Sequence, residues 1–207
     1  MLKCPIPLVE DLIPEGRGNR PGGTMVPKYL TIHDTADPGA TAKDEAGYLK
    51  GNDAAEAPVS WHFTVDDQGA YQHLPLGEHG WHAADGRGPG NMTSIGIELC
   101  EVQDRQAVER NAAKLVAWLL VETGLEVSRM VPHRHWYPKD CPRLLLPRWD
   151  AFVGRVYLEK YRLLPVPWDP SMEIALLADR GIVNGTHKPT DRPTWGELAT
   201  VLNRLST

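Results

Sequence analysis

Apolar and polar side chains alternate with a period of two in three stretches of the chain. This alternation is typical of β-strands that have two different faces. It predicts strands over residues 26–35 and 93–100, and a hairpin within residues 59–75 that turns at Asp-Asp-Gln-Gly. In the two single strands, His33 and Glu98 fall on the face opposite the Ile and Leu side chains.

A three- and four-residue apolar spacing appears in other stretches and predicts amphipathic helices. The clearest is residues 104–124, followed by residues 148–161 and a short helix over residues 41–51. Thr41 and Asp44 have the spacing of a capping pair at the start of the short helix. The first and the last of these three stretches each end on a glycine, a residue that commonly stops a helix.

Glycine and proline mark the remaining segments as loops or linkers. Residues 85–91 contain three glycines, and the prolines of residues 131–142 indicate a loop. Strands interleaved with helices predict an α/β fold, a mixed central β-sheet flanked by helices, over residues 1–163. A proline-rich linker at 164–170 leads to residues 171–207, which we expect to form a small helical C-terminal module.

Composition narrows the class of protein. The 207 residues are 42% hydrophobic and 24% charged, as in an ordinary globular protein, and the net charge of −5 argues against nucleic-acid binding. No apolar run is long enough for a transmembrane helix, and the N-terminal residues lack the apolar segment of a secretory signal. The sparse cysteines (Cys4, Cys100 and Cys141) favour a reducing compartment or a metal-ligand role over a disulfide framework.

Three side chains are candidate ligands of a metal ion. His33 ends a predicted strand, while His133 and Cys141 flank Lys139 in the 131–142 loop. Two histidines and a cysteine leave one position of a tetrahedral zinc site open, as a catalytic zinc needs. The alternative is a hydrogen-bonded strand histidine and a buried cysteine that acts as a small apolar residue.

Two charged residues also have alternative interpretations. Glu98 is either a general base beside a metal or an edge-strand glutamate that faces solvent. Lys139 is either a fixed cation that stabilises an oxyanion or an ordinary solvated lysine. The residues alone leave both choices open.

Four blocks of sequence carry a family resemblance: YLTIHDT, VSWHFTVDDQGAYQ, DGRGPGNMTSIGIELC and HRHWYPKDCP. Their order, and the spacing His-x5-Lys-x-Cys within the last block, resemble the zinc-dependent N-acetylmuramoyl-L-alanine amidases of the phage lysozyme and peptidoglycan-recognition-protein superfamily. The chain looks most like the endolysins of phages and prophages of Gram-positive bacilli. The resemblance covers about residues 26–155.

The resemblance implies a role for each matching residue. It implies zinc (Zn2+) as the cofactor, with His33, His133 and Cys141 as its ligands. Glu98 matches the acidic residue that removes a proton from water, and Lys139 matches the lysine that stabilises the oxyanion. His135 has no counterpart and is expected to be a bystander.

Substrate contacts are expected from two further residues. Trp61 occupies the position of a catalytic tyrosine in some relatives; because indole does not transfer protons at neutral pH, Trp61 is expected to shape the site or stack against substrate. His82 is a second candidate substrate contact, or a loop residue held by hydrogen bonds. His62 falls on the opposite face of its strand and is expected to be structural.

The implied reaction is hydrolysis of the amide bond between N-acetylmuramic acid and L-alanine, with bacterial peptidoglycan as the partner. Two other functions stay open: a cytoplasmic amidase that recycles anhydro-muropeptides, and a peptidoglycan-binding module without catalysis. The absence of a signal fits an enzyme that accumulates in the host cytoplasm and acts on the wall after release. Membrane insertion is not expected.

The C-terminal residues loosely resemble one S-layer-homology unit. Thr194 and Glu197 have the spacing of a capping box before the last helical pattern. We expect residues 171–207 to attach the protein to secondary cell-wall polymers; the alternative is a helical hairpin that completes the fold or makes a homodimer.

Overall fold

The computed structural model describes residues 2–57, 59–164, 177–178, 181–182, 197 and 199–201. The chain divides into two compact units, residues 1–164 and residues 165–207. The fold below is that of the first unit. Most of the second unit, including Thr194 of the expected capping box, lies outside the described residues, so the role of the C-terminal module stays a prediction.

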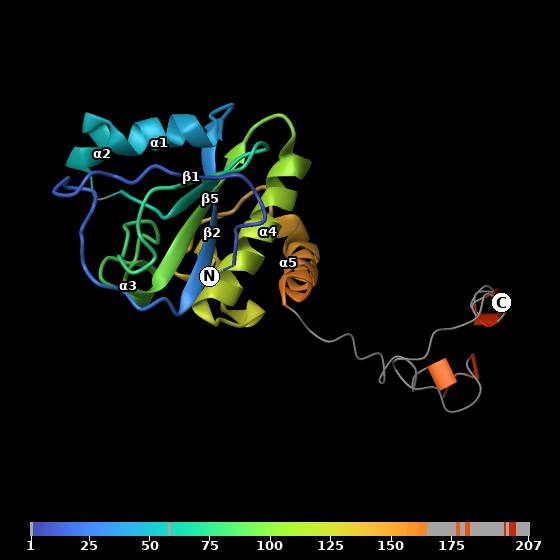
Figure 1. The fold of residues 1–207 in the computed structure, drawn as a ribbon. Coiled ribbons are helices and arrows are strands. Elements are labelled where there is room, and N and C mark those ends of the chain that lie inside the picture. Colours follow the sequence, from blue (N-terminus) through green and yellow to red (C-terminus); the bar gives the residue numbers. More distant parts are fainter. Residues whose placement is uncertain are drawn as a thin grey trace. The chain divides into compact units, whose positions relative to one another are not determined.

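A six-stranded mixed sheet forms the centre of the first unit (Figure 1). Its strands, in chain order, are β1 (Leu8–Glu10), β2 (Tyr29–Pro38), β3 (Phe63–Val65), β4 (Ala70–Gln72), β5 (Ser94–Glu101) and β6 (Met130–Pro132). They lie in the order β1-β4-β3-β5-β2-β6, and only the β3–β4 hairpin pairs antiparallel. The expected α/β fold with a mixed sheet is therefore confirmed.

The helices surround this sheet. They are α1 (Ala42–Lys50), α2 (Asn52–Glu56), α3 (Pro89–Thr93), α4 (Arg105–Thr123) and α5 (Trp149–Leu163), with single 3-10 turns at Val127–Arg129, His133–His135 and Leu146–Arg148. The two long helices, α4 and α5, pack together on one side of the sheet, as Figure 1 shows. The apolar face of the central strands packs against α4, and together they form the main core, which includes Leu30, Ile97 and Leu115.

The sequence patterns locate these elements to within a few residues. The capping pair at the start of α1 is present: Thr41 accepts a hydrogen bond from the Asp44 backbone, and the Asp44 side chain accepts one from the Thr41 backbone. At the end of α4, Gly124 takes a left-handed conformation with φ of 69°. That conformation is unfavourable for residues with a Cβ, which explains why a glycine ends this helix.

Two segments that were expected to be loops contain regular structure. Residues 89–93 form the short helix α3, because the Asp85 carboxylate accepts hydrogen bonds from the backbone N–H groups of Gly90 and Asn91. Residues 130–132 extend the sheet as β6, which pairs with β2. Neither segment has a hydrophobic period, since three-residue strands and five-residue helices are too short to show one.

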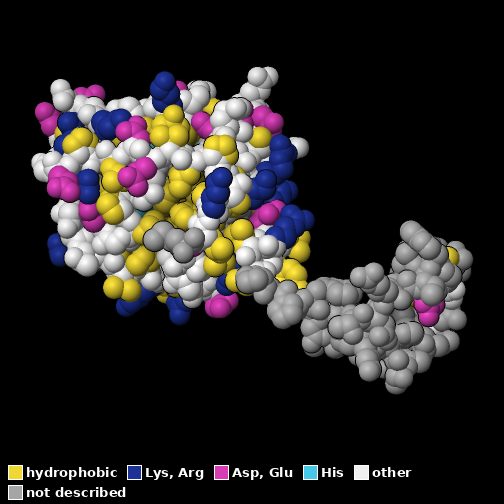
Figure 2. All heavy atoms as spheres, in the orientation of Figure 1, with side chains coloured by type: hydrophobic (Ala, Val, Ile, Leu, Met, Phe, Trp, Pro, Cys, Tyr) yellow, Lys and Arg dark blue, Asp and Glu magenta, His cyan; other side chains and the backbone are white. Residues whose placement is uncertain are grey.

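The surface of the first unit carries both signs of charge. In the view of Figure 2, blue Lys and Arg side chains and magenta Asp and Glu side chains both occur across the visible face. In the part of the chain that the structure describes, no helix has the length and apolar character needed to cross a membrane.

Candidate active site and metal centre

His33 and Glu98 lie side by side in the middle of the sheet. They occupy the same register position on the neighbouring strands β2 and β5, and β3 pairs with β5 on its other side. Glu98 therefore lies on a central strand, which excludes its interpretation as an edge-strand glutamate. Alternation along both strands points the two side chains away from the α4 core and into a cleft.

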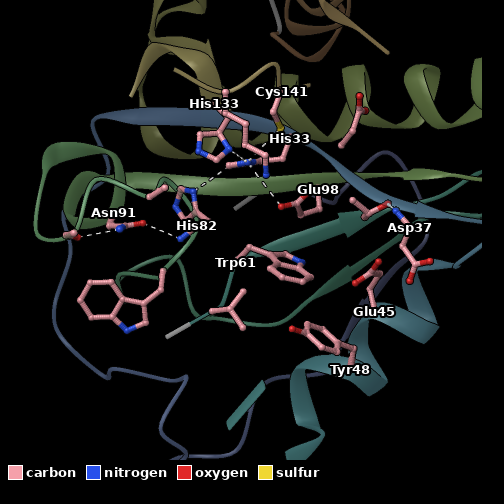
Figure 3. A pocket seen from close by; sticks show the side chains of 17 residues that line it. His33, Asp37, Glu45, Tyr48, Trp61, His82, Asn91, Glu98, His133 and Cys141 are labelled. Atoms are coloured by element: carbon pink, nitrogen blue, oxygen red, sulfur yellow. Dashed lines mark hydrogen bonds and ion pairs between the residues drawn. The ribbon is translucent and has the colours of Figure 1, made fainter. Parts of the chain in front are cut away.

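The segment after β6 brings the other two candidate ligands to His33. His133 Nδ1 lies 3.0 Å from His33 Nδ1, and Cys141 Sγ lies 3.9 Å from the same atom. All three side chains are buried, and one potential ligand atom from each lies within 4.8 Å of the others. Residues a hundred positions apart in the sequence thus form one cluster (Figure 3).

Asp34, next to His33 on β2, anchors the chain that carries Cys141. One carboxylate oxygen accepts the backbone N–H of Leu144 at 2.7 Å, and the other pairs with Arg105. The carbonyl oxygen of Cys141 also accepts the backbone N–H of Arg134 at 3.1 Å. These bonds hold the thiol against the end of β2.

The hydrogen-bond acceptors around the histidines determine their tautomers, because a carbonyl oxygen cannot donate. His133 Nε2 lies 3.1 Å from the Ala83 carbonyl oxygen and must carry the proton. His82 Nε2 lies 3.2 Å from the Ser94 carbonyl oxygen, so His82 Nδ1 is free to accept the Nε2 proton of His33 at 3.1 Å. The Nδ1 atoms of His33 and His133 therefore both present lone pairs to the cluster.

Two lone pairs that face each other at 3.0 Å, with a thiol beside them, repel unless a cation lies between them. Two imidazole nitrogens and one thiolate form a typical ligand set for zinc with a fourth position open. The donor set of this chain therefore fits a zinc ion held by His33, His133 and Cys141.

Burial controls the protonation of the groups in the cluster. Desolvation lowers the pKa of His33 well below its ordinary value, and the neighbouring His82 and His133 lower it further, so His33 is neutral. Desolvation raises the pKa of the Cys141 thiol to about 12, whereas the backbone N–H of Asp34 opposes this rise by stabilising the thiolate. A bound metal cation deprotonates a coordinating thiol, so ligation would override the effect of burial.

Glu98 is placed to exchange protons beside this cluster. Its Oε1 lies 3.8 Å from His33 Nδ1, and its side chain is 12% exposed. Its buried Oε2 has no hydrogen-bond partner among the described residues. Desolvation and the charge of Glu45 raise the pKa of Glu98 to about 8, while Lys139 opposes the rise. Because His33 is neutral, the pair is not a salt bridge, and Oε2 is left for a ligand or water.

A cavity of about 690 Å³ opens above the cluster and includes every residue expected at the site. The wall opposite His33 is aromatic: Trp61 and Tyr48 stack at a ring-centroid distance of 6.3 Å (Figure 3). Trp61 Nε1 donates to Thr64 Oγ1 at 2.7 Å, which fixes the indole ring. Lys139 lines the same cavity. The substrate contact expected of Trp61 stays a prediction.

The remaining histidines differ in their surroundings. Both ring nitrogens of His82 are in contact with protein, as described above, so a contact of its ring with substrate stays a prediction. His62 is buried, with Nε2 against the Glu78 carbonyl and Nδ1 accepting the Gly96 N–H, in agreement with the structural role expected for it. His135 is exposed and packs against Tyr29 and Trp136, away from the cluster.

The structure adds two residues to the site that the sequence interpretation missed. Glu45 of α1 lines the cavity although it is only 6% exposed; burial and the charges of Asp37 and Asp44 raise its pKa to about 7. Its signal was a carboxylate on the otherwise apolar stripe of α1. Asn91 of α3 is 3% exposed and holds the backbone beside His82. No sequence pattern marked it.

A buried His-His-Cys cluster with a carboxylate on the adjacent central strand of an α/β fold is the arrangement that a metal-dependent hydrolase requires. Residues 23–144 match the family model described as N-acetylmuramoyl-L-alanine amidase. The chain belongs to this amidase family.

Individual relatives agree with this assignment. The N-acetylmuramoyl-L-alanine amidase XlyA of Bacillus subtilis (strain 168) is 48% identical over 153 residues, which are 72% of this chain and 50% of XlyA. CwlH, an amidase of the same organism, is 45% identical over 156 residues, 73% of this chain and 61% of CwlH. The solved structure of the catalytic domain of XlyA superposes on this chain with a TM-score of 0.69 and a sequence identity of 46%. The match covers 99% of that domain and 73% of this chain.

The chain thus spans about half to three fifths of the length of these two curated relatives. The residues matched by the family model, 23–144, include the whole His-His-Cys cluster.

Proposed function

We propose that the chain is a peptidoglycan hydrolase that cleaves the amide bond between N-acetylmuramic acid and L-alanine. The observation that carries the proposal is the convergence of two histidine Nδ1 lone pairs and the Cys141 thiol beside the partly unpaired carboxylate of Glu98. The names of the relatives describe the same activity. The site residues are proposed as follows: His33, His133 and Cys141 as zinc ligands, and Glu98 and Lys139 as catalytic residues.

Zinc at this donor set would polarise the scissile carbonyl and lower the pKa of a water molecule. Glu98 accepts a proton from the attacking water as the oxygen bonds to the lactyl carbonyl carbon. The ammonium group of Lys139 stabilises the oxyanion that forms. When the C–N bond breaks, Glu98 returns the proton to the leaving nitrogen of L-alanine. One carboxyl group therefore serves as base and then as acid.

The high pKa of Glu98 suits this double role. A carboxyl group with an ordinary pKa would hold a proton too weakly to deliver it to an amine near neutral pH. Burial and the charge of Glu45 raise the pKa of Glu98, and the positive charge of Lys139 limits the rise. A cation at the donor set would act in the same direction as Lys139 and bring the pKa of Glu98 back toward neutrality.

Digestion of purified cell walls followed by mass spectrometry tests the proposal. We expect new N-terminal L-alanine amines to appear without new reducing sugars. Reducing ends would instead indicate a glycosidase. A parallel digestion of soluble anhydro-muropeptides separates a wall hydrolase, which prefers intact walls, from a recycling amidase. Binding to walls without new termini would identify a non-catalytic module, although the complete His-His-Cys set argues against it.

For residues 171–207 we propose attachment to secondary cell-wall polymers, with 164–170 as the linker. Co-sedimentation with purified walls, before and after chemical removal of the secondary polymers, compares the full chain with residues 1–164. We expect the shorter chain to cleave soluble fragments but to sediment less. Equal sedimentation of both forms would contradict this role, and a change from dimer to monomer in light scattering would favour the alternative of a homodimer.

A further inference from the structure

Asn91 makes three side-chain hydrogen bonds, all of them to one short segment of chain. Its Oδ1 accepts the backbone N–H groups of His82 and Ala83 at 2.8 and 2.7 Å. Its Nδ2 donates to the Gly86 carbonyl at 2.9 Å. The amide supplies both kinds of bond from a single buried group: two acceptor bonds to the N–H groups of His82 and Ala83, and one donor bond to Gly86.

The two residues held by Asn91 each contact one of the proposed histidine ligands. His82 Nδ1 lies 3.1 Å from His33 Nε2, and the Ala83 carbonyl oxygen lies 3.1 Å from His133 Nε2. Two consecutive residues thus keep the ring proton of each histidine on Nε2, the nitrogen that faces away from the cluster. Figure 3 shows Asn91, His82 and His33 in a line that ends at the cluster.

The same segment is held under backbone strain. Ala84 has a φ of 58°, in the left-handed region that residues with a Cβ rarely adopt. Such a conformation persists only where surrounding interactions impose it. The imposing interactions are the three bonds of Asn91, together with the Asp85 carboxylate that caps α3. Without Asn91, the segment would relax and the Ala83 carbonyl would turn.

We propose that Asn91 is a positioning residue that determines, through His82 and Ala83, that both histidine ligands present Nδ1 to the metal. The inference rests on the proposed zinc site and concerns which atoms form it. Loss of the Ala83 carbonyl from its place would allow His133 to carry its proton on Nδ1, which removes a ligand atom. Loss of the His82 contact would do the same for His33. Asn91 itself touches neither ligand ring in the hydrogen bonds described.

The test reads the tautomers directly. Long-range 1H–15N spectra of protein labelled with 15N-histidine distinguish a protonated, a free and a zinc-bound ring nitrogen. We expect the zinc-loaded wild-type chain to show Nε2–H and metal-bound Nδ1 for both His33 and His133. Competition with a chelator gives the zinc dissociation constant of each variant independently of any activity.

Two variants and one matched control separate positioning from general stability. Asn91→Ala should weaken zinc binding about 10- to 100-fold, the range typical of partners that orient metal ligands. In the zinc-free state it should show a population of the Nδ1–H tautomer at His133. Asn91→Asp keeps an acceptor for both backbone N–H groups and should retain the wild-type tautomers. Thr93→Ala removes a hydrogen bond to the Pro89 carbonyl in the same short helix, does not touch the 82–83 segment, and should leave both readouts unchanged.

The outcomes are decisive in both directions. Coordination through Nε2 of either histidine in the wild-type chain overturns the inference while the zinc site survives, and this result needs no variant to fold. Asn91→Ala with wild-type zinc affinity and tautomers also overturns it. A wild-type chain that binds no zinc overturns the zinc site and the inference together. Should Asn91→Ala not fold, His82→Phe removes the contact to His33, together with the bond to the Ser94 carbonyl, and leaves the contact of Ala83 with His133 in place. It should allow His33 to carry its proton on Nδ1 while His133 keeps its proton on Nε2.

Discussion

Glu98 and His33 occupy the same register position on two adjacent central strands, and Glu98 Oε1 lies 3.8 Å from His33 Nδ1. The neutral histidine and the carboxyl group with its raised pKa are thus fixed relative to each other by the ladder between β2 and β5. This pairing would separate the two tasks proposed for the site: His33 would hold the metal, and Glu98 would transfer the proton.

Glu98→Gln should abolish proton transfer while it preserves the shape of the side chain. We expect the rate of wall hydrolysis to fall about 10²- to 10⁴-fold, the usual worth of a general base or acid. Zinc content by metal analysis should stay at the wild-type value, because the substitution removes none of the three proposed ligands. Glu101→Gln, on the same strand but outside the cavity, is the control and should stay near the wild-type rate. Hydrolysis at the wild-type rate by Glu98→Gln would contradict the proposed role of Glu98 in proton transfer.

Lys139→Met removes the positive charge that lines the cavity but keeps a long side chain. Loss of one group that stabilises an oxyanion costs about 10²- to 10³-fold in kcat. We expect a fall of this size with unchanged zinc binding, measured by muropeptide cleavage and chelator competition. Lys28→Met, at an exposed lysine, is the matched control. A change confined to KM would show that Lys139 binds substrate rather than stabilises the transition state.

Cys141→Ser should remove a zinc ligand, because a hydroxyl is a far weaker ligand than a thiolate. We expect the zinc dissociation constant to rise by more than about 100-fold, the upper end of what loss of an orienting partner alone costs. Cys4→Ser changes a cysteine away from the cluster and should retain one zinc per chain. Retention of stoichiometric zinc by Cys141→Ser would contradict the ligand set.

Gly96→Ala tests the packing that positions His82. A Cβ at Gly96 would lie 2.7 Å from His82 Cγ, so the ring would have to leave its place beside His33. We expect zinc affinity to fall about 10-fold or more by chelator competition. Gly154→Ala in α5 is the contrasting variant: its Cβ would meet nothing within 4 Å, and it should raise the free energy of unfolding by about 0.5–1 kcal/mol. Unchanged zinc affinity in Gly96→Ala would show that the His82 contact is dispensable.

Glu45→Gln should make stability less dependent on pH. Folding raises the pKa of Glu45 from 4.5 to about 7, so the folded chain holds this proton more tightly than the unfolded chain. The stabilising contribution is therefore complete below about pH 4.5 and is lost as the pH rises through about 7. We expect wild type and variant to melt together at about pH 4.5, and the variant to melt a few degrees higher at about pH 8, since 1 kcal/mol corresponds to about 2–4 °C at this size. A constant difference in Tm at both pH values would contradict the shifted pKa.

Local patterns determined much of the fold. The period-two alternation located β2, β5 and the β3–β4 hairpin, and the helical spacing with its caps located α1, α4 and α5. These features were predictable because alternation, capping and the glycine stop at Gly124 depend on residues close in sequence. The short elements α3 and β6 were not predictable, since a carboxylate from outside the helix and a neighbouring strand stabilise them.

The candidate site also depends in part on local sequence and in part on tertiary structure. The sequence by itself supplied the types of residue: two histidines, a cysteine, a glutamate and a lysine in blocks that resemble a known family. Tertiary structure alone decided that His33 and His133 meet through Nδ1, that Glu98 lies on a central strand, and that Asn91 holds the backbone of His82 and Ala83. The physical reason is that hydrogen bonds between side chains and distant backbone groups, and the desolvation that sets each pKa, exist only after the strands have paired and closed water out of the cleft.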